Sequence, residues 1–385
     1  MNASPTSPTI RPAGAAAPAG YRPGPVRRAG TVPRAWPRWV PYAAALWSLA
    51  YCALATTWAV GVAAGPRYPF DRAGDPGNDG GILWYADREV TAAVVAVLCL
   101  AGVAVAGLVA GRPAGARPSA LTRPLVAFAA LAAVTLAVVV PDQRVLTAVG
   151  YLPIVVVGAP WGFPPVSYAD AWPWPVQNQL ILMAGGVLWA ATAVVAIRRG
   201  SAGNRAAGWA GPASARRWGR WATGVAVAVP LLYALDRLAW LAGINLGVSD
   251  ELVSDVRDTD LRYAALGLAL GAIGGAALTL GLAQRWGEVF PRWIPVLRGR
   301  RVPPALAIVP ASFVAIAVTS AGLTVVRMLV TQRDSLPAED LGAVVPMVLW
   351  PFWGVALGAA TLAYHLRRRH RNGCHSDQTV HDHRP

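Results

Sequence analysis

Lysine is absent from this sequence, and charged residues of every kind are scarce. Only 14% of the 385 residues are charged, against about 25% in typical soluble globular domains. Hydrophobic residues make up 55% of the chain, and a chain of this composition cannot hide its apolar surface from water. The scarcity of charge therefore excludes an ordinary soluble domain and favours a membrane protein.

Several catalytic and cofactor-binding motifs are also missing. The cysteines are Cys52, Cys99 and Cys374, and their places in two apolar runs and a tail imply no disulfide framework. The sequence contains no Gly-x-x-x-x-Gly-Lys phosphate loop, no His-Glu-x-x-His and no Gly-x-Ser-x-Gly. All five histidines fall in residues 365–385, which excludes a conventional His-assisted nucleophile inside the membrane. We therefore predict no cofactor, and enzymatic activity is disfavoured.

Eight apolar stretches are long enough to cross a bilayer as helices, which takes roughly 20 residues for about 30 Å of hydrocarbon. Apolar residues run continuously in them rather than alternating, so helices are favoured over a barrel. The expected spans are Val40–Ala64, Val90–Ala110, Leu121–Val140, Gln177–Ile197, Trp221–Ala242, Leu261–Ala283, Pro304–Val326 and Leu341–His365. The predicted fold class is all-α transmembrane, with about eight membrane-spanning helices.

Arginine is distributed unevenly between the two sides of these spans. With Arg123 and Arg262, at the edges of their spans, counted with the adjacent sides, the two tails and the even-numbered loops hold 25 of the 34 arginines and the opposite side holds seven; only Arg237 and Arg327 lie deeper inside spans. Because cytoplasmic loops carry the excess of positive charge, we expect a multi-pass protein of the cell membrane with both termini in the cytoplasm. A crossing by the short apolar segment 145–159 would invert this pattern. We therefore place that segment outside, as a re-entrant or interfacial element.

The first four spans resemble the last four in sequence. Residues 40–53 align without gaps on residues 229–242, and seven of the fourteen positions are identical. A second match relates the fourth and eighth spans: Gly185, Leu188, Ala190, Ala191, Thr192, Arg198 and Arg199 reappear as Gly354, Leu357, Ala359, Ala360, Thr361, Arg367 and Arg368. The alternative explanation is compositional bias with a shared Arg-Arg stop signal. The order of the two matches favours an internal duplication.

The duplication predicts the organisation of the chain. The expected parts are a disordered Arg/Pro-rich cytoplasmic tail (1–38), a first four-helix half (39–199), a cytoplasmic linker (200–220), a second four-helix half (221–366) and a basic, His-containing cytoplasmic tail (367–385). Because each half holds an even number of spans, the halves are expected to be parallel repeats. Repeats of this kind place their binding site at the interface between the halves.

Two stretches of the second half resemble a known group of proteins. They are residues 286–303, with Trp286-Gly287-Glu288 and Gly299-Arg300-Arg301-Val302-Pro303, and residues 350–361, which begin Trp350-Pro351-Phe352-Trp353-Gly354. These stretches are similar to a loop and the last helix of a family of actinobacterial multi-pass integral membrane proteins with no assigned activity. The resemblance covers mostly the C-terminal half. It implies an all-α membrane fold and transfers no functional residue.

Three charged residues inside the spans form the candidate polar site. Asp236 and Arg237 lie in the outer part of the fifth span, and Arg327 lies near the outer end of the seventh. A charge at a helix centre costs roughly 2.5–3.5 kcal/mol on insertion scales. The functional hypothesis is that Asp236 and Arg237 line an outward-opening polar cavity that binds or couples a solute. The favoured interpretation is an interhelical salt bridge, with Arg327 as the candidate partner, because helix neighbours point about 100° apart and need not pair with each other.

Two groups of side chains have the chemistry of metal ligands. The outer loop after the fifth span is acidic, and its candidate ligands for a hard cation such as Ca²⁺ are Asp255, Asp258 and Asp260. The C-terminal tail is rich in imidazole, and its candidate ligands for Zn²⁺ or Ni²⁺ are His375, His381 and His383. Neither group has the spacing of a folded metal site. An acidic outer loop and a solvated tail are the alternative interpretations.

Small residues and arginines predict further contacts. Glycines recur every four residues in three spans, at Gly107 and Gly111, at Gly267, Gly271 and Gly275, and at Gly354 and Gly358. This spacing lets helices approach closely, within one molecule or, alternatively, in a homodimer. The loop after the sixth span carries five arginines beside the bilayer: Arg285, Arg292, Arg298, Arg300 and Arg301. There we expect anionic lipid headgroups as partners, and no nucleic acid.

Three classes of function fit these observations. The leading hypothesis is a permease-like or channel-like protein for small solutes, built from two four-helix halves. A non-catalytic membrane scaffold or regulatory subunit is the second, and it requires a protein partner. A membrane enzyme that uses the acids Asp255 and Asp258 at the outer face is the third.

Overall fold

The computed structural model describes residues 38–62, 66–70, 81–83, 86–113, 119–158, 160, 172–200, 211–259, 261–290, 298–331 and 340–381. Contacts divide the chain into residues 1–38 and residues 39–385. The fold described below is that of the second unit. It consists of helices joined by turns, with one isolated bridge between Val289 and Arg301 among the described residues.

The helices follow one another in the order α1 (Val40–Ala59), α2 (Arg88–Gly111), α3 (Thr122–Val134), η2 (Thr135–Val139), α4 (Gln143–Gly158), α6 (Trp174–Gly200), α7 (Pro212–Leu241), α8 (Asp250–Asp258), α9 (Leu261–Gly281), η5 (Arg285–Gly287), α10 (Pro304–Thr331), α11 (Leu341–Val348) and α12 (Trp350–His381). Within the described residues, eight helical segments are long and apolar enough to cross a bilayer: Val40–Ala59, Arg88–Gly111, Thr122–Val139, Trp174–Arg199, Ala213–Leu241, Leu261–Gly281, Pro304–Thr331 and Leu341–Arg369. The prediction of an all-α transmembrane fold with eight spans is confirmed.

Small side chains form much of the buried core, and many large apolar side chains are exposed. One core cluster is built around Ala44, Ala106, Ala129 and Trp189 from four different helices. By contrast, leucine side chains such as Leu131 are more than half exposed. A surface of this kind is stable only where hydrocarbon replaces water, and small residues let helices approach closely in that solvent. The chain is therefore a multi-pass integral membrane protein.

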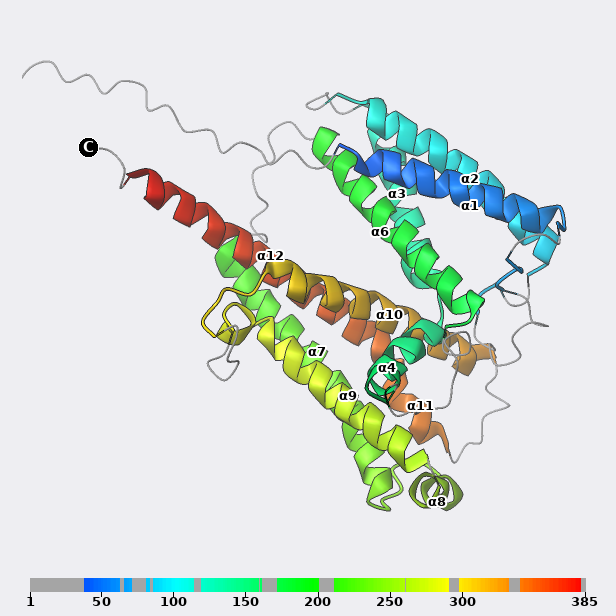
Figure 1. The fold of residues 1–385 in the computed structure, drawn as a ribbon, viewed down its shortest axis with the longest axis vertical. Coiled ribbons are helices and arrows are strands. Elements are labelled where there is room, and N and C mark those ends of the chain that lie inside the picture. The colour runs from blue at the N-terminus through cyan, green and yellow to red at the C-terminus, as the bar shows by residue number, and fades with distance from the viewer. Residues whose placement is uncertain are drawn as a thin grey trace, which may run out of the picture. The chain divides into compact units, whose positions relative to one another are not determined.

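The spanning helices group into two sets of four by their contacts (Figure 1). The first set comprises α1, α2, α3 with η2, and α6, and the second set comprises α7, α9, α10 and α12. In the first set α2 packs on α1, α1 on α6 and α6 on α3. In the second set α9 packs on α7, α7 on α12 and α12 on α10. The order of packing, second–first–fourth–third helix, is therefore the same in both sets.

Aligned positions of the two sets also play the same structural part. Residues buried in α1 include Val40, Ala44, Ser48 and Tyr51, and their aligned counterparts in α7, also buried, are Val229, Tyr233, Arg237 and Trp240. The hydroxyl groups of Thr192 and Thr361, which are aligned in the fourth helices, each donate to the carbonyl four residues earlier at 2.8 Å. These equivalences support the internal duplication, which stays a prediction.

The paired arginines at the ends of the fourth helices have similar partners. Arg199 in α6 donates to the carbonyl groups of Val109 and Ala110 at the end of α2. Arg367 in α12 donates to the carbonyl group of Leu282, directly after α9. In both sets an arginine of the fourth helix therefore binds carbonyl groups at or directly after the end of the second helix, where the helical hydrogen-bond ladder stops.

Several helices extend beyond the bounds expected from hydropathy. Helix α7 begins at Pro212 inside the expected linker 200–220, and α12 continues to His381 through most of the expected tail 367–385. The acidic segment after α7 contains α8, whose first turn is capped by the Ser249 hydroxyl, which accepts from the Leu252 N–H. Hydropathy detects the membrane-embedded part of a helix and not its polar extensions, which explains these differences.

The glycines separate into packed and open positions. A Cβ atom at Gly354 would overlap Thr319 and Ala315, so this glycine lets α12 approach α10 closely. Nothing lies within 4 Å of the corresponding point at Gly107, Gly111, Gly271 and Gly275. The expectation of internal packing is therefore correct for Gly354 and wrong for those four positions, whose open side faces away from the described neighbours.

The first and second sets meet through α10, which packs on α4 and η2. Val145 of α4, Met183 of α6 and Ala317 of α10 form a buried cluster at this contact. Helix α4 contains residues 145–158 of the apolar segment and has 16 residues, fewer than the roughly 20 needed to span a bilayer. Its place between α6 and α10 makes it part of the contact between the sets.

Candidate functional site

A buried polar cluster lies where α10 meets the first set. We call it the interset cluster, and its residues are Asp142, Arg144, Gln179, Ser320, Thr324 and Arg327. They come from the turn between η2 and α4, from α4, from the start of α6 and from the second half of α10. Asp142, Gln179, Ser320 and Thr324 are at most 2% exposed. The site therefore joins segments of both sets away from bulk solvent.

The carboxylate of Asp142 is held on both oxygens. Arg144 donates from Nε to Oδ1 at 3.1 Å and to Oδ2 at 3.0 Å, and from Nη2 to Oδ2 at 2.8 Å. Gln179 donates from Nε2 to Oδ2 at 2.8 Å and accepts the Asp142 N–H at 3.1 Å. Several charge-assisted hydrogen bonds to one buried carboxylate fix its position and compensate its desolvation.

Helix α10 binds the same turn through its backbone. The Ser320 hydroxyl donates to the carbonyl of Pro141, and Arg327 Nη1 donates to the carbonyl of Val139 at 3.0 Å. The π-helical segment η2 explains why these carbonyls need partners. In a π-helix each N–H donates to the carbonyl five residues earlier, as the Val140 N–H does to the Thr135 carbonyl at 2.9 Å. The segment is followed by Pro141, which has no N–H to donate.

Two donors in this region have no hydrogen-bond partner among the described residues. They are Nε of Arg327 and Nδ2 of Asn178, and both atoms are buried. Asn178 precedes Gln179 in α6, and its Oδ1 accepts from the Tyr51 hydroxyl at 3.1 Å. Buried donors without a partner are costly. They are therefore groups that an acceptor oxygen of a ligand or of water would satisfy.

The structure separates the three charged residues singled out from the sequence. Asp236 and Arg237 bind each other, Nη1 to Oδ2, at 3.1 Å. The Arg237 guanidinium also lies over the rings of Tyr233, at 4.6 Å, and Trp240, at 4.1 Å. Arg327 is in the interset cluster, where it bonds Thr324 Oγ1 at 3.0 Å and interacts electrostatically with Asp142.

The expected salt bridge between Asp236 and Arg327 is therefore wrong. The long arginine side chain reaches back along its own helix to the preceding residue, which helix angles alone do not exclude. Both members of the Asp236–Arg237 pair are 7% exposed. With its charge neutralised and its guanidinium covered by aromatic rings, the pair has the features of a structural element rather than of an open polar cavity.

No family model, curated protein or solved structure matches the chain. The resemblance to an actinobacterial membrane protein family stays a prediction.

The candidate metal ligands do not form a site in the part of the chain that the structure describes. Asp255 and Asp258 are exposed on α8, which buries Val253 and Val256 on its other face. Across the described residues, no group of three or more His, Cys, Asp or Glu side chains lies close enough to hold a metal ion. Asp260 and His383, and the side chains of His375 and His381, lie outside the described residues.

Sequence reasoning missed most of the interset cluster. It identified Arg327 but treated Asp142 and Arg144 as parts of an outer connection, and it did not consider Gln179. A signal was present, because Asp142, Gln179 and Arg327 all stand toward the same side of their respective spans. Comparing the polar residues of different spans by depth would have grouped them.

Proposed function

We propose that this protein is a permease-like transporter of small solutes, in which the first and second sets move against each other at the interset cluster. The observation that supports this most directly is the position of the buried Asp142 and the partly buried Arg327 at the contact between two four-helix sets. Ionisable residues at membrane depth are expensive and commonly mark solute or ion pathways.

Each set has the features of a body that can move as a unit. The first set has its own core around Ala129 and Trp189, and the second has its own around Ala315 and Tyr364. Contact between them runs mainly through one helix, α10. We call the contact of α10 with α4 and η2 the seam. Two similar packed units joined there fit alternating access, in which the units rock against each other around a solute site at the seam.

The expected topology places this seam toward the outside. Both termini are proposed to be cytoplasmic, and η2 and the second half of α10 then approach the outer face. The exposed arginines Arg298, Arg300 and Arg301 then lie on the cytoplasmic side, where anionic headgroups are their proposed partners. Terminal tags that react with impermeant reagents only after permeabilisation would support this topology, and tags reactive in intact cells would contradict it.

Cysteine accessibility tests the movement without knowledge of the solute. In a variant whose native cysteines are replaced by alanine, Ser320→Cys introduces a thiol into the seam. The matched control is Ala269→Cys, because Ala269 is fully buried in α9, which packs on α7 and α8. Asp258→Cys, exposed on α8, reports the rate for an open position on the same side.

We expect an impermeant maleimide added outside cells to label Ser320→Cys slowly and Ala269→Cys not at all. Labelling of neither buried position, when Asp258→Cys has reacted completely, contradicts an outward-opening seam. Equal labelling of both buried positions indicates general loosening and also contradicts the proposal. Uptake by proteoliposomes across a broad screen of solutes then identifies the cargo, and a screen without any accumulation counts against transport.

A further inference from the structure

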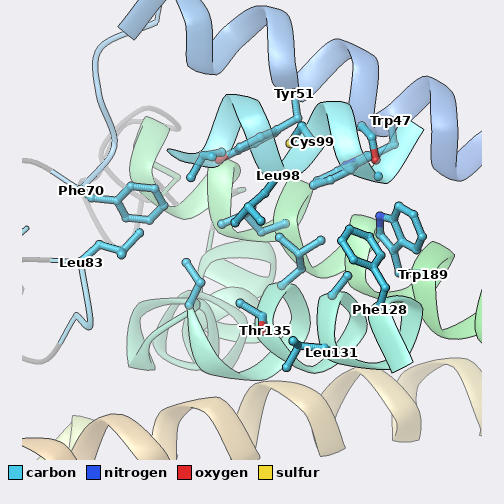
Figure 2. A pocket seen from close by; sticks show the side chains of 17 residues that line it. Trp47, Tyr51, Phe70, Leu83, Leu98, Cys99, Phe128, Leu131, Thr135 and Trp189 are labelled. Atoms are coloured by element: carbon cyan, nitrogen blue, oxygen red, sulfur yellow. The ribbon is translucent and has the colours of Figure 1, made fainter. Parts of the chain in front are cut away.

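The first set contains an apolar pocket that the proposed transport does not use. Figure 2 shows Trp47 and Tyr51 of α1, Cys99 of α2, Phe128 of α3 and Trp189 of α6 around one space. The empty volume, including the open mouth, is about 850 Å³. Like ligand pockets in general, it is lined mainly by hydrophobic and aromatic side chains with few polar groups.

The pocket exists because α2 and α3 scarcely touch. Helix α2 packs on α1, and α3 packs on α6, so a gap remains between α2 and α3 beside the contact of α1 with α6. Gly102 of α2 lies opposite Ser48 and Trp189, and a Cβ atom there would press against both side chains. The ring of Trp189 therefore lies close to α2 and lines the gap.

The mouth of the pocket opens at the middle of the membrane-spanning segments. Leu98 stands near the centre of α2 and Leu131 near the centre of the span formed by α3 and η2, and both line the pocket. Each is more than half exposed. Because the centres of these spans lie in the hydrocarbon, this side of the pocket is open to lipid.

We infer that this pocket binds the hydrocarbon chain of a bilayer lipid. An apolar space of this size cannot remain empty beside liquid hydrocarbon, because each wall atom that faces a void loses its dispersion contacts. Water is a poor occupant, since it requires two to four polar partners and the walls are almost entirely apolar. The aromatic and aliphatic walls therefore favour a hydrocarbon chain over a bulky polar solute.

Two hydroxyl groups give the pocket a polar feature. Ser48 and Thr135 line it, and neither side chain has a hydrogen-bond partner within the described residues, whereas the hydroxyls of Thr56, Thr192 and Thr361 bond carbonyls of their own helices. The inference does not rest on the transport proposal, because the pocket lies inside the first set and the proposed movement occurs at its edge.

Photo-crosslinking tests this inference. The protein is reconstituted in nanodiscs of phosphatidylcholine that carries a diazirine in one acyl chain, and the labelled residues are mapped by mass spectrometry. Ala132→Phe places a ring in the pocket, because Ala132 lines it. Ala130→Phe is the matched control, because Ala130 is exposed on the same helix and does not line the pocket.

We expect label on pocket residues of the wild type and of Ala130→Phe, and loss of that label in Ala132→Phe. Val95→Trp fills the pocket from the opposite wall and is expected to have the same effect, so the test remains decisive if one variant fails to fold. Label spread evenly over all lipid-facing helices of the wild type overturns the inference. Pocket label that persists in both filled variants, with the proteins folded, overturns it as well.

Discussion

Replacement of Asp142 by alanine is expected to destabilise the protein strongly. The carboxylate is buried, and the side chain of its partner Arg144 is only 16% exposed. Removing one member of a buried ion pair costs about 3–5 kcal/mol, because the opposite charge loses that partner. The amide of Gln179 also loses its acceptor, which adds roughly 1–3 kcal/mol if no water replaces it. We therefore expect Asp142→Ala to lower the free energy of unfolding by at least about 3 kcal/mol.

The double variant separates the stranded charge from the lost contacts. Asp142→Ala with Arg144→Ala removes both charges, so its cost should be smaller than the sum of the two single costs by roughly 0.5–3 kcal/mol. Unfolding in mixed micelles can be followed by the fluorescence of the 17 tryptophans. The control is Asp258→Ala on the exposed face of α8, with an expected change within about 0.5 kcal/mol.

Two results would refute this reasoning. In the first, Asp142→Ala costs no more than Asp258→Ala, so the carboxylate contributes nothing to the contact between the sets. In the second, the costs of the Asp142 and Arg144 substitutions simply add, so the two side chains are not coupled as their distances require.

Three further predictions follow from the described contacts. Gly354→Ala should destabilise by about 1–3 kcal/mol through overpacking against Thr319, whereas Gly271→Ala, at an open helical position, should be neutral or stabilising by about 0.5–1 kcal/mol; equal melting temperatures for both variants would contradict this. Asp236→Ala should cost about 3–5 kcal/mol, and adding Arg237→Met should recover part of it in the same unfolding assay, while an unchanged cost argues against the pair. Millimolar Ca²⁺ should leave the melting temperature unchanged, because Asp255 and Asp258 point to solvent; a rise that is lost in Asp255→Asn would show a bound cation.

The eight spans could be predicted from the sequence because their signal is local. Each is a continuous apolar run, and the solvent selects such runs independently of their neighbours. Asp236 and Arg237 stood out for the same reason, as charges in an apolar window. Their mutual pairing depends on a side-chain rotamer, and sequence spacing does not encode it.

The interset cluster depends on contacts between distant parts of the chain. Asp142 meets Gln179 across 37 residues, and Ser320 meets Pro141 across 179. Nothing in either segment alone indicates the other. The π-helical turn that exposes the carbonyls of Val139 and Pro141 is likewise stabilised by tertiary partners, which a single-sequence reading cannot assign.

The η2 segment links the pocket of the first set to the interset cluster. Thr135, Leu136 and Val140 line the pocket, while the carbonyl of Val139 binds Arg327 in the second set. A change of shape in these few residues therefore alters both sites, and such coupling must be reciprocal for binding free energies. We expect Arg327→Leu to change the acyl-chain label in the pocket, and Ala132→Phe to change the labelling rate of Ser320→Cys.

The control for this coupling is the Asp236–Arg237 pair, for which the contacts show no link to η2. Asp236→Ala, in a detergent or lipid where it remains folded, should leave both readouts unchanged. If Arg327→Leu leaves the pocket label unchanged and Ala132→Phe leaves the seam labelling unchanged, η2 is a rigid spacer. The pocket and the seam would then be independent sites, because a rigid spacer transmits no difference in binding free energy from one to the other.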